Sequence, residues 1–283
     1  MTDLSLMCVH AHPDDECIST GGTLLLAADE GIRTAVVTCT GGERGEIHNM
    51  DEESIRPRLA EVRREELAAS LRVLGAGEPR FLGYVDSGMM GTEDNTDPAS
   101  FWQASMDEAI GRLVAQIREF KPDVFVTYDA FGGYGHPDHM QTHRVGLLAA
   151  EACAVPALYP EAGPAWRVKK VYAATMPKSA IFRAVTLLTE AGLPSPFPVV
   201  DRVEDVPLGV DDDELGAAID VRSVVKRKLE ALHCHQSQLD PESFFLNVPE
   251  EFSDEAFGTE WYVPMRSDVT IDGMEDDLFT GLR

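Results

Sequence analysis

The sequence has no long apolar run and comparatively few basic residues. No segment approaches the roughly 18 consecutive apolar residues of a membrane-spanning helix, and no basic-then-apolar stretch of the secretory type opens the chain. Lys and Arg number 24 against 49 Asp and Glu, a formal net charge of −25 over 283 residues. Such a charge repels phosphate backbones and anionic lipid. We therefore expect a soluble, cytoplasmic protein that binds neither nucleic acid nor membranes.

Cysteine is also scarce. The five cysteines are odd in number and lack C-x-x-C spacing, which argues against a disulfide framework. Cys8 and Cys39 lie in strand-like apolar runs, so we expect them to be small core residues. The sequence has no G-x-G-x-x-G after its first expected strand, no G-x-x-x-x-G-K-[ST] and no G-x-S-x-G. Dinucleotide binding, P-loop chemistry and a serine nucleophile elbow are therefore not indicated.

Strand-like and helix-like segments alternate along the first part of the chain. Apolar runs of strand length occupy residues 4–10, 33–40, 80–85, 123–129 and 167–176. Segments with helical periodicity or helix-end signals lie between them, at 21–31, 56–74, 106–120 and 139–153. This alternation predicts the α/β class, as a Rossmann-like, open, mostly parallel sheet with helices on both faces.

The pattern weakens after residue 176. Helices are expected near 179–191 and within 219–238, in a part of the chain rich in proline, glycine and acidic residues. We expect a single domain over residues 1–283, with a core over about 1–176 and a less regular C-terminal extension over about 177–283.

Two clusters of His and Asp each follow a predicted strand. "HPDD" occupies residues 12–15, after the first strand, and "GGYGHPDH" occupies 132–139, after the strand at 123–129. Open parallel sheets bind ligands outside the carboxyl ends of their strands. The two clusters should therefore meet at one edge of the sheet, although they are far apart in the sequence.

Together the clusters have the composition of a catalytic zinc site. His12, Asp15 and His139 would supply three protein ligands and leave one position for water, with Zn²⁺ as the expected metal and Fe²⁺ also compatible. Asp14, between two ligands, would act as general base on the activated water. His136 would stabilise or protonate the departing group.

The other histidines and one glycine-rich loop have simpler interpretations. His10, His48 and His233 stand outside any motif and are expected to be structural, and His143 is expected to support the ligands. The loop "TGGERGE" at 40–46 is either a flexible connection or a wall of the site with Glu46 facing a ligand.

"AHPDDE" with a downstream "GHPDH" resembles the PIG-L/LmbE family of metal-dependent de-N-acetylases, and most closely its branch in mycothiol metabolism. The resemblance runs through most of residues 4–150 and recurs in patches near the C terminus. It implies a hydrolase that cleaves a linear amide C–N bond. Its substrate would be a small amino-sugar molecule of the N-acetylglucosaminyl-inositol type, or a natural-product amino sugar, from which it would remove an acetyl group. A homo-oligomer is compatible with the sequence.

The resemblance also implies residue roles. The Zn²⁺ ligands would be His12, Asp15 and His139, with Asp14 as general base. Tyr134 would help to stabilise the tetrahedral intermediate, His136 would assist charge or leaving-group protonation, and Asp138 would orient a neighbouring imidazole. The residues that hold sugar or inositol hydroxyls would be Glu46, Arg63 and Asp86.

Three alternatives stay open. Within the family, "GYGHPDH" and "DSGMMGT" favour the deacetylase, whereas "HQSQLDPESFF" (235–245) and "DLFTGL" favour a mycothiol S-conjugate amidase. A Mg²⁺-dependent phosphoryl-transfer enzyme with Asp14 or Asp15 as nucleophile is disfavoured, because Mg²⁺ prefers oxygen ligands. A non-catalytic sugar-binding or partner-binding module is disfavoured by the complete set of catalytic groups.

Overall fold

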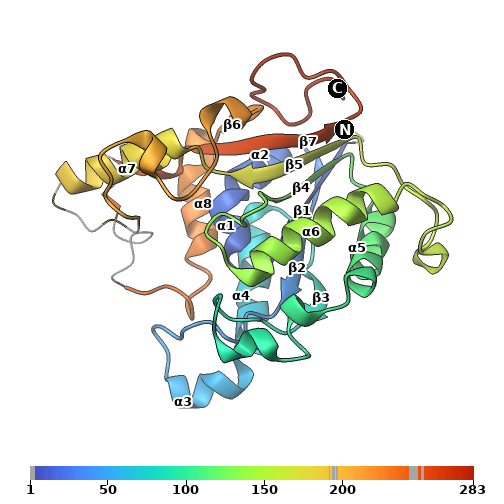
Figure 1. Ribbon diagram of the computed structural model, residues 1–283, viewed down its shortest axis with the longest axis horizontal. Helices are drawn as coiled ribbons and strands as arrows, with labels where there is room; N and C mark the ends of the chain where they lie inside the picture. The colour runs from blue at the N-terminus through green and yellow to red at the C-terminus, as the bar shows by residue number, and fades with distance from the viewer. Residues whose placement is uncertain (1–3, 191, 193–194, 196, 242–247, 250–251) are drawn as a thin grey trace.

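The computed structural model describes residues 4–190, 192, 195, 197–241, 248–249 and 252–283. Residue 191, the last of the helix expected near 179–191, and residues 242–245 of the "HQSQLDPESFF" stretch lie outside the described residues. Figure 1 shows a central sheet with helices packed around it. Its strands come from the whole length of the chain, from the deep-blue β1 near the N terminus to the red β7 near the C terminus.

The sheet of the described residues has seven strands in the order β3-β2-β1-β4-β5-β7-β6. The first five along the chain run parallel to one another: β1 (Ser5–His10), β2 (Arg33–Thr40), β3 (Arg80–Tyr84), β4 (Val124–Tyr128) and β5 (Lys170–Thr175). The last two are antiparallel additions at the β5 side: β6 (Ala217–Asp220) and β7 (Thr259–Ser267). The predicted α/β class with a mostly parallel open sheet is confirmed.

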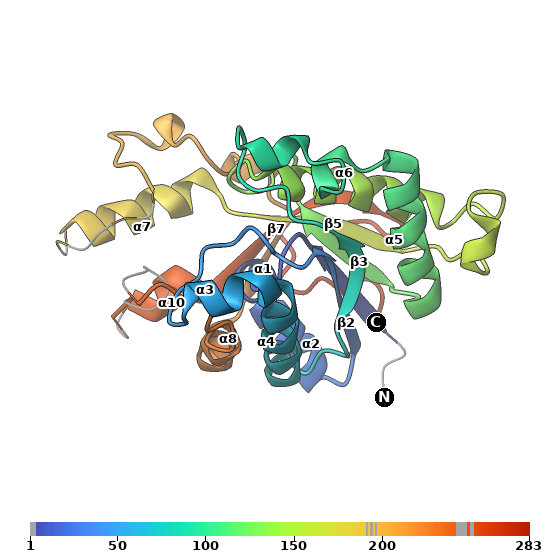
Figure 2. The same ribbon diagram turned by 90° about the horizontal axis from the view of Figure 1, so that it is seen from below.

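Helices cover both faces of this sheet (Figure 2). One face carries α2 (Gly21–Asp29), α4 (Leu59–Leu74) and α8 (Val225–Leu232), and the other carries α5 (Met106–Phe120) and α6 (Pro137–Ala152). The other α-helices within the described residues are α1 (Asp15–Ser19), α3 (Glu52–Ile55), α7 (Lys178–Glu190) and α10 (Ser253–Phe257). Helix α4 ends at Gly75, whose φ of 69° is the left-handed conformation that glycine adopts without steric cost.

Alternate residues of each central strand face two separate cores, because successive side chains of a strand point to opposite faces. In β1, Leu6 and Cys8 pack towards α2 and α4, whereas Met7 and Val9 pack towards α5 and α6. Cys39 lies in the second core, and both it and Cys8 are fully buried, as expected. The parallel strands are thus covered on both sides, which explains their nearly continuous apolar sequences.

The C-terminal extension takes part in the main sheet, which the sequence did not indicate. Strand β7 pairs along the whole length of β5 and carries β6 on its other side. Its sequence, TEWYVPMRS, contains Pro264 next to a shift in register with β5, and a proline within a strand-like run argues against a strand. The division of the chain into one domain with a core and an extension stays a prediction.

The topology brings the two motif clusters to one edge. Strands β1 and β4 are neighbours, with Leu6 paired to Val124 and Cys8 to Val126. The loops that follow them, beginning at Ala11 and Asp129, therefore leave the sheet side by side. No helix in the described ranges has both the length and the apolar character needed to cross a bilayer.

Candidate active site

The loop after β1 is anchored to its neighbours before it turns into α1. The Ala11 N–H donates to Tyr128 Oη at 3.1 Å, and Thr40 N–H donates to Ala11 O at 3.0 Å. His12 and Pro13 follow, and Asp14 adopts φ 105° and ψ −33° directly before α1 begins. A residue with a Cβ seldom occupies this region of φ. The chain therefore makes a tight turn, after which Asp14 contacts Arg63 and Asp15 contacts the two imidazoles.

The loop after β4 depends on a close approach at Gly132. A Cβ at this position, where φ is 66°, would lie 2.4 Å from His139 Cβ, so only glycine lets the loop fold over the start of α6. Helix α6 begins with Pro137, and the His136 imidazole caps it by accepting from Asp138 N–H at 3.1 Å through Nδ1. His136 and His139 thereby reach the site from the first turn of one helix.

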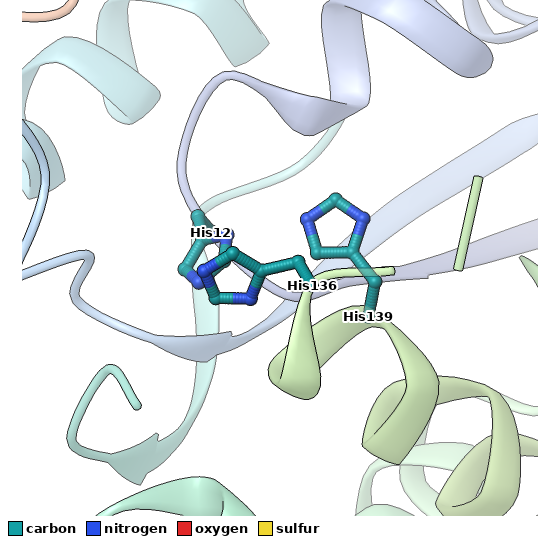
Figure 3. Close-up of side chains that lie close together, drawn as sticks. All are labelled: His12, His136 and His139. Carbon is teal, nitrogen blue, oxygen red and sulfur yellow. The ribbon is translucent and has the colours of Figure 1, made fainter. Parts of the chain in front are cut away.

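The three predicted ligands converge. Asp15 Oδ2 lies 3.4 Å from His139 Nε2 and 3.5 Å from His12 Nδ1. Two ligands bound tetrahedrally at about 2.0–2.1 Å are about 3.3 Å apart, so the separation of Asp15 from each of the two imidazoles suits a shared cation. Ligand atoms of His12, His136 and His139 also lie within 4.8 Å of one another, and Figure 3 shows the three imidazoles gathered at the edge of the sheet.

Hydrogen bonding leaves one ring nitrogen of each predicted histidine ligand directed at this point. His139 Nδ1 donates to Gly132 O at 3.1 Å, while its Nε2 is buried and has no hydrogen-bond partner among the residues that the structure describes. His12 Nε2 lies 3.1 Å from Asp138 Oδ2, which leaves Nδ1 on the side of Asp15. An unmatched buried nitrogen is costly unless a ligand occupies it, so the residues fit a bound metal.

Charge around the imidazoles supports the same conclusion. Burial lowers the pKa of His139 to about 4, although the Asp15 carboxylate opposes the change, so the ring is neutral as a metal ligand must be. Burial also disfavours charge on His12, but the surrounding carboxylates, Asp86 foremost, outweigh burial and raise the pKa of His12 well above its ordinary value. The carboxylates thus favour positive charge here, which a divalent cation would supply.

Asp14 has the environment of a general base. Burial raises the pKa of Asp14 to about 6, and the Arg63 guanidinium, 3.1 Å from Asp14 Oδ2, limits the rise. A carboxyl group with a pKa near neutrality can both take and return a proton at working pH. The Asp14 side chain is 23% exposed, so it borders the cavity instead of being sealed beneath it.

A cavity of about 410 Å³ opens over these groups. It is lined by most of the predicted site residues, namely His12, Asp14, Asp15, Glu46, Arg63, Asp86, Tyr134 and His136. His139 and Asp138 lie behind this lining, with exposed fractions of 3% and 0%. The structure therefore brings all ten predicted site residues to one place, although their roles stay predictions.

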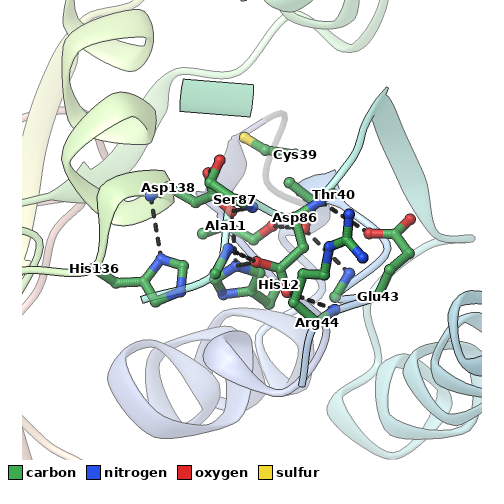
Figure 4. Close-up of polar contacts among 12 residues, drawn as sticks. Ala11, His12, Cys39, Thr40, Glu43, Arg44, Asp86, Ser87, His136 and Asp138 are labelled. Atoms are coloured by element: carbon green, nitrogen blue, oxygen red, sulfur yellow. Dashed lines mark hydrogen bonds and ion pairs between the residues drawn. The ribbon is translucent and has the colours of Figure 1, made fainter. Parts of the chain in front are cut away.

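Asp138 and Asp86 both face His12 (Figure 4). Asp138 accepts from Ser87 N–H at 2.9 Å and from the Ser87 hydroxyl, and its Oδ2 also contacts His12 Nε2. Asp138 is thus within hydrogen-bond distance of an imidazole, and its role in orienting that ring stays a prediction. Asp86 Oδ1 lies 3.6 Å from His12 Nε2 and accepts from Gly88 N–H, so only part of its carboxylate remains for a substrate hydroxyl.

The other two predicted hydroxyl-binding residues differ in exposure. The Glu46 side chain is 89% exposed and lies 3.4 Å from His48 Nε2, at the mouth of the cavity. The Arg63 side chain is 3% exposed and donates to Gly42 O and to Asp14. Glu46 is exposed to solvent, where a ligand can reach it, whereas Arg63 is already engaged with the predicted base.

Sequence reasoning missed several residues of this region. Arg44, Asp94, Thr92 and Gln238 also line the cavity, and Arg44 Nε lies 3.0 Å from Asp94 Oδ1 across its mouth. Arg44 stands inside the glycine-rich loop already singled out, so its position carried a signal. Gln238 stands in the "HQSQLDPESFF" stretch, whose resemblance to the amidase did not indicate that this residue reaches the cavity.

The structural histidines were predicted correctly in one clear case. His10 is buried with both nitrogens matched, Nδ1 to Tyr128 Oη at 3.2 Å and Nε2 to Thr20 Oγ1 at 2.9 Å. His143 Nδ1 lies 2.8 Å from Tyr128 O, behind the ligands. A complete set of protein partners distinguishes His10 from His139.

The family model described as PIG-L: GlcNAc-PI de-N-acetylase matches residues 7–150, which contain both motifs. The chain belongs to this family. It is 43% identical to a 1D-myo-inositol 2-acetamido-2-deoxy-alpha-D-glucopyranoside deacetylase of Geodermatophilus obscurus, over 98% of this chain and 97% of that one. A relative of the same description from Catenulispora acidiphila is 42% identical over 98% of this chain and 89% of its own.

Solved structures share the fold of this PIG-L family member. One is the N,N'-diacetylchitobiose deacetylase of Pyrococcus horikoshii, with a TM-score of 0.64 and 21% identity over 92% of this chain and 83% of that one. Another is GalB, a 4-carboxy-2-hydroxymuconate hydratase of Pseudomonas putida, with a TM-score of 0.62 and 20% identity over 95% and 99%. Because one fold carries both activities, the reaction has to be argued from the site.

Proposed function

We propose that this protein is a metal-dependent hydrolase that removes the acetyl group from an N-acetylglucosaminyl-inositol. The convergence of Asp15 Oδ2, His12 Nδ1 and the unmatched His139 Nε2 beside Asp14 carries the proposal. The relatives described as deacetylases of a 2-acetamido-2-deoxy-glucopyranosyl inositol support the substrate. Zn²⁺ is the proposed metal, and Fe²⁺ also suits two imidazoles and a carboxylate.

A divalent cation held by His12, Asp15 and His139 would supply Lewis-acid polarisation of the amide carbonyl and would lower the pKa of water. Asp14 accepts a proton as the water oxygen attacks the acetyl carbon. The C–N bond then breaks, the proton held by Asp14 passes to the amine nitrogen, and acetate and the free amino sugar are released. Asp14 can perform both steps because the pKa of its carboxyl group is about 6.

His136 suits the role of a neutral hydrogen-bond donor. Its Nδ1 accepts from Asp138 N–H, so Nε2 carries the hydrogen and can donate to the oxygen of the tetrahedral intermediate. Burial, together with His12 and His139, lowers the pKa of His136 to about 3, which favours donation of a hydrogen bond over delivery of a proton. Tyr134, 48% exposed at the rim, is placed to add a second donor.

The cavity suits a hydroxyl-rich substrate. Beside the site it presents the carboxylates of Glu46, Asp86 and Asp94 and the polar side chains of Arg44 and Gln238. Such groups can pair with sugar and inositol hydroxyls, and pairing is required where polar groups of the substrate leave water. We propose that the glucosamine ring lies over the ligands with the inositol directed towards the mouth of the cavity.

The test is release of primary amine from a panel of amides by the purified, zinc-loaded protein. We expect turnover of N-acetylglucosaminyl-inositol, little turnover of free N-acetylglucosamine, and loss of turnover after chelation that added Zn²⁺ restores. Preferred cleavage of a mycothiol S-conjugate would instead identify the amidase. No amine release from any member of the panel would contradict a hydrolytic function.

A further inference from the structure

A second cluster of titratable side chains lies buried beneath the Asp14 turn. Its members are fully or almost fully buried, and they come from α1, from α4 and from the segment after α8: Glu16, Cys17, Ser70 and His235. Nothing in the proposed mechanism uses them. Ligand atoms of Glu16, Cys17 and His235 lie within 4.8 Å of one another, so the first question is whether they hold a metal.

The distances indicate hydrogen bonds. His235 Nε2 lies 2.8 Å from Glu16 Oε1, and the Ser70 hydroxyl donates to the same oxygen at 2.6 Å. Both are shorter than the roughly 3.3 Å expected between two ligands of one tetrahedral ion and are normal for hydrogen bonds to a carboxylate. Cys17 Sγ adds a third donor at 3.2 Å. Glu16 Oε1 is therefore already saturated by protein donors.

The other oxygen of Glu16 contacts the catalytic turn. Asp14 N–H donates to Glu16 Oε2 at 2.9 Å. This is the residue with φ 105°, which an L-amino acid occupies only when its surroundings hold it there. On the opposite side Arg63 donates to Pro13 O and to Asp14 Oδ2. The backbone of the predicted base is thus held between Arg63 and Glu16.

His235 owes its position to a separate anchor. Two residues further on, Ser237 donates through its N–H and its hydroxyl to the Glu66 carboxylate of α4, each at 2.7 Å. The segment after α8 is thereby fixed to α4, and His235 projects from it to Glu16. A part of the C-terminal extension therefore reaches the strained turn through only one intervening side chain.

We propose that His235 and Glu16 are positioning residues that hold Asp14 in its left-handed backbone conformation and so aim its carboxylate at the attacking water. The expected change in kcat rests on the proposed function, whereas the expected change in backbone conformation rests only on the observed φ of Asp14. Neither residue touches the substrate. Since misplacement of a reacting group by about 1 Å can reduce the rate about 100-fold, the effect should fall on kcat.

The test compares three single variants of the full-length, zinc-loaded protein. His235→Leu removes the donor to Glu16, His235→Gln keeps an N–H donor without an imidazole, and His233→Leu changes an exposed histidine two positions away as the matched control. For His235→Leu we expect kcat to fall about 10- to 100-fold with KM and zinc content unchanged. His235→Gln should recover to within about threefold of the parent, and His233→Leu should match the parent.

A folded, zinc-loaded His235→Leu protein with parental kcat would overturn the inference, and so would a loss expressed only in KM. Should His235→Leu fail to fold, Ser70→Ala removes another donor to the same Glu16 oxygen and should lower kcat about 3- to 10-fold. An unchanged kcat in that variant would overturn the inference equally.

Failure of the proposed function would appear differently, as absence of amine release by the parent protein on every amide. The inference is then decided by crystal structures of the parent and of His235→Leu or Ser70→Ala. It requires that Asp14 leave the left-handed region in the variant. A φ that stays near its parental 105° would overturn it whatever the substrate proves to be.

Discussion

Two largely buried clusters of charged residues differ in how completely their polar atoms are matched. Around Glu260, the carboxylate accepts from Gly22 N–H at 2.7 Å, from Thr23 N–H at 2.8 Å and from Lys228 Nζ at 2.7 Å. Around Asp15, the nearby His139 Nε2 has no hydrogen-bond partner in the described part of the chain. Burial of charge is common to both. Of these two clusters, as far as the structure describes them, only the one around Asp15 contains a buried nitrogen without a hydrogen-bond partner.

We expect the Glu260 cluster to stabilise the fold and the Asp15 cluster to take part in the chemistry. The Glu260 cluster joins β7, α8 and the start of α2, so it fixes the C-terminal strands to the core. The Asp15 cluster, with His12 and His139, joins the start of α1 to the first turn of α6 at the carboxyl edge and faces a cavity. Saturated networks rigidify a fold, whereas an unmatched buried nitrogen beside a cavity is explained by a ligand that binds there. Substitutions in the two clusters should therefore alter different observables.

The largest effect should follow from Asp14→Asn. Removal of the general base should lower kcat by about 10² to 10⁴, because proton transfer by a positioned side chain contributes that much to rate. Zinc content should stay at the parental level, since the side chain at this position lies outside the proposed ligand set. Metal analysis and amine-release kinetics on one preparation measure both, and parental kcat would exclude Asp14 as the base.

Glu260→Gln should have the next largest effect, and on a different observable. It leaves Lys228 buried without its countercharge, and breaking a buried ion pair in this way costs about 3–5 kcal/mol in free energy of unfolding. Zinc content and kcat of the folded fraction should be unchanged. Denaturant titration of the metal-free protein measures the loss.

His139→Gln should have the reverse effect of Glu260→Gln, because it changes metal binding and not stability. Metal affinity should collapse, whereas the free energy of unfolding without metal should stay within about 1.5 kcal/mol of the parent, since one hydrogen bond to Gly132 O is at stake. If Glu260→Gln lowered zinc content as much as His139→Gln does, the two clusters would not be functionally separate.

The pH dependence should identify the base in the intact protein. Because Asp14 must be ionised to accept a proton, kcat/KM should rise as pH passes upward through about 6, the raised pKa of Asp14. Below that pH activity should fall about tenfold per unit. Activity rises with pH in this range because burial favours the protonated form of Asp14, which is inactive. A profile that is flat between pH 5 and about 7 would contradict this assignment.

The smallest effect should come from Glu46→Gln at the exposed mouth of the cavity. Loss of charge on a solvated side chain should raise KM about 2- to 10-fold, as one hydrogen bond to a hydroxyl would, while kcat and stability stay at parental values. Steady-state kinetics measure this split. An effect confined to kcat would place Glu46 at the reacting bond instead of at the sugar.

The sequence was informative where motif and topology coincide. "HPDD" and "GHPDH" each follow a parallel strand, so the carboxyl-edge rule was sufficient to bring His12 and His139 together. Strand β7 was missed because Pro264 and its half-buried residues conceal the alternation of a strand. Helix α1 was missed because five residues are too few to show a period.

For residues that act through a distant partner, the sequence did not indicate that partner. His235 stands in "HCHQSQ", which has no metal-ligand spacing that points to Glu16, and Gln238 reaches the cavity only because the segment after α8 folds back onto α4. The sequence shows which residue types are present but not which buried nitrogen remains unmatched. That difference between His10 and His139 needed three-dimensional contacts.

The most direct measurement is anomalous diffraction at the zinc edge from crystals of the zinc-loaded protein. The account predicts one strong peak among His12 Nδ1, Asp15 Oδ2 and His139 Nε2, at about 2.0–2.2 Å from each. A peak in the Glu16–Cys17–His235 cluster instead, or coordination by His136 in place of Asp15, would contradict it.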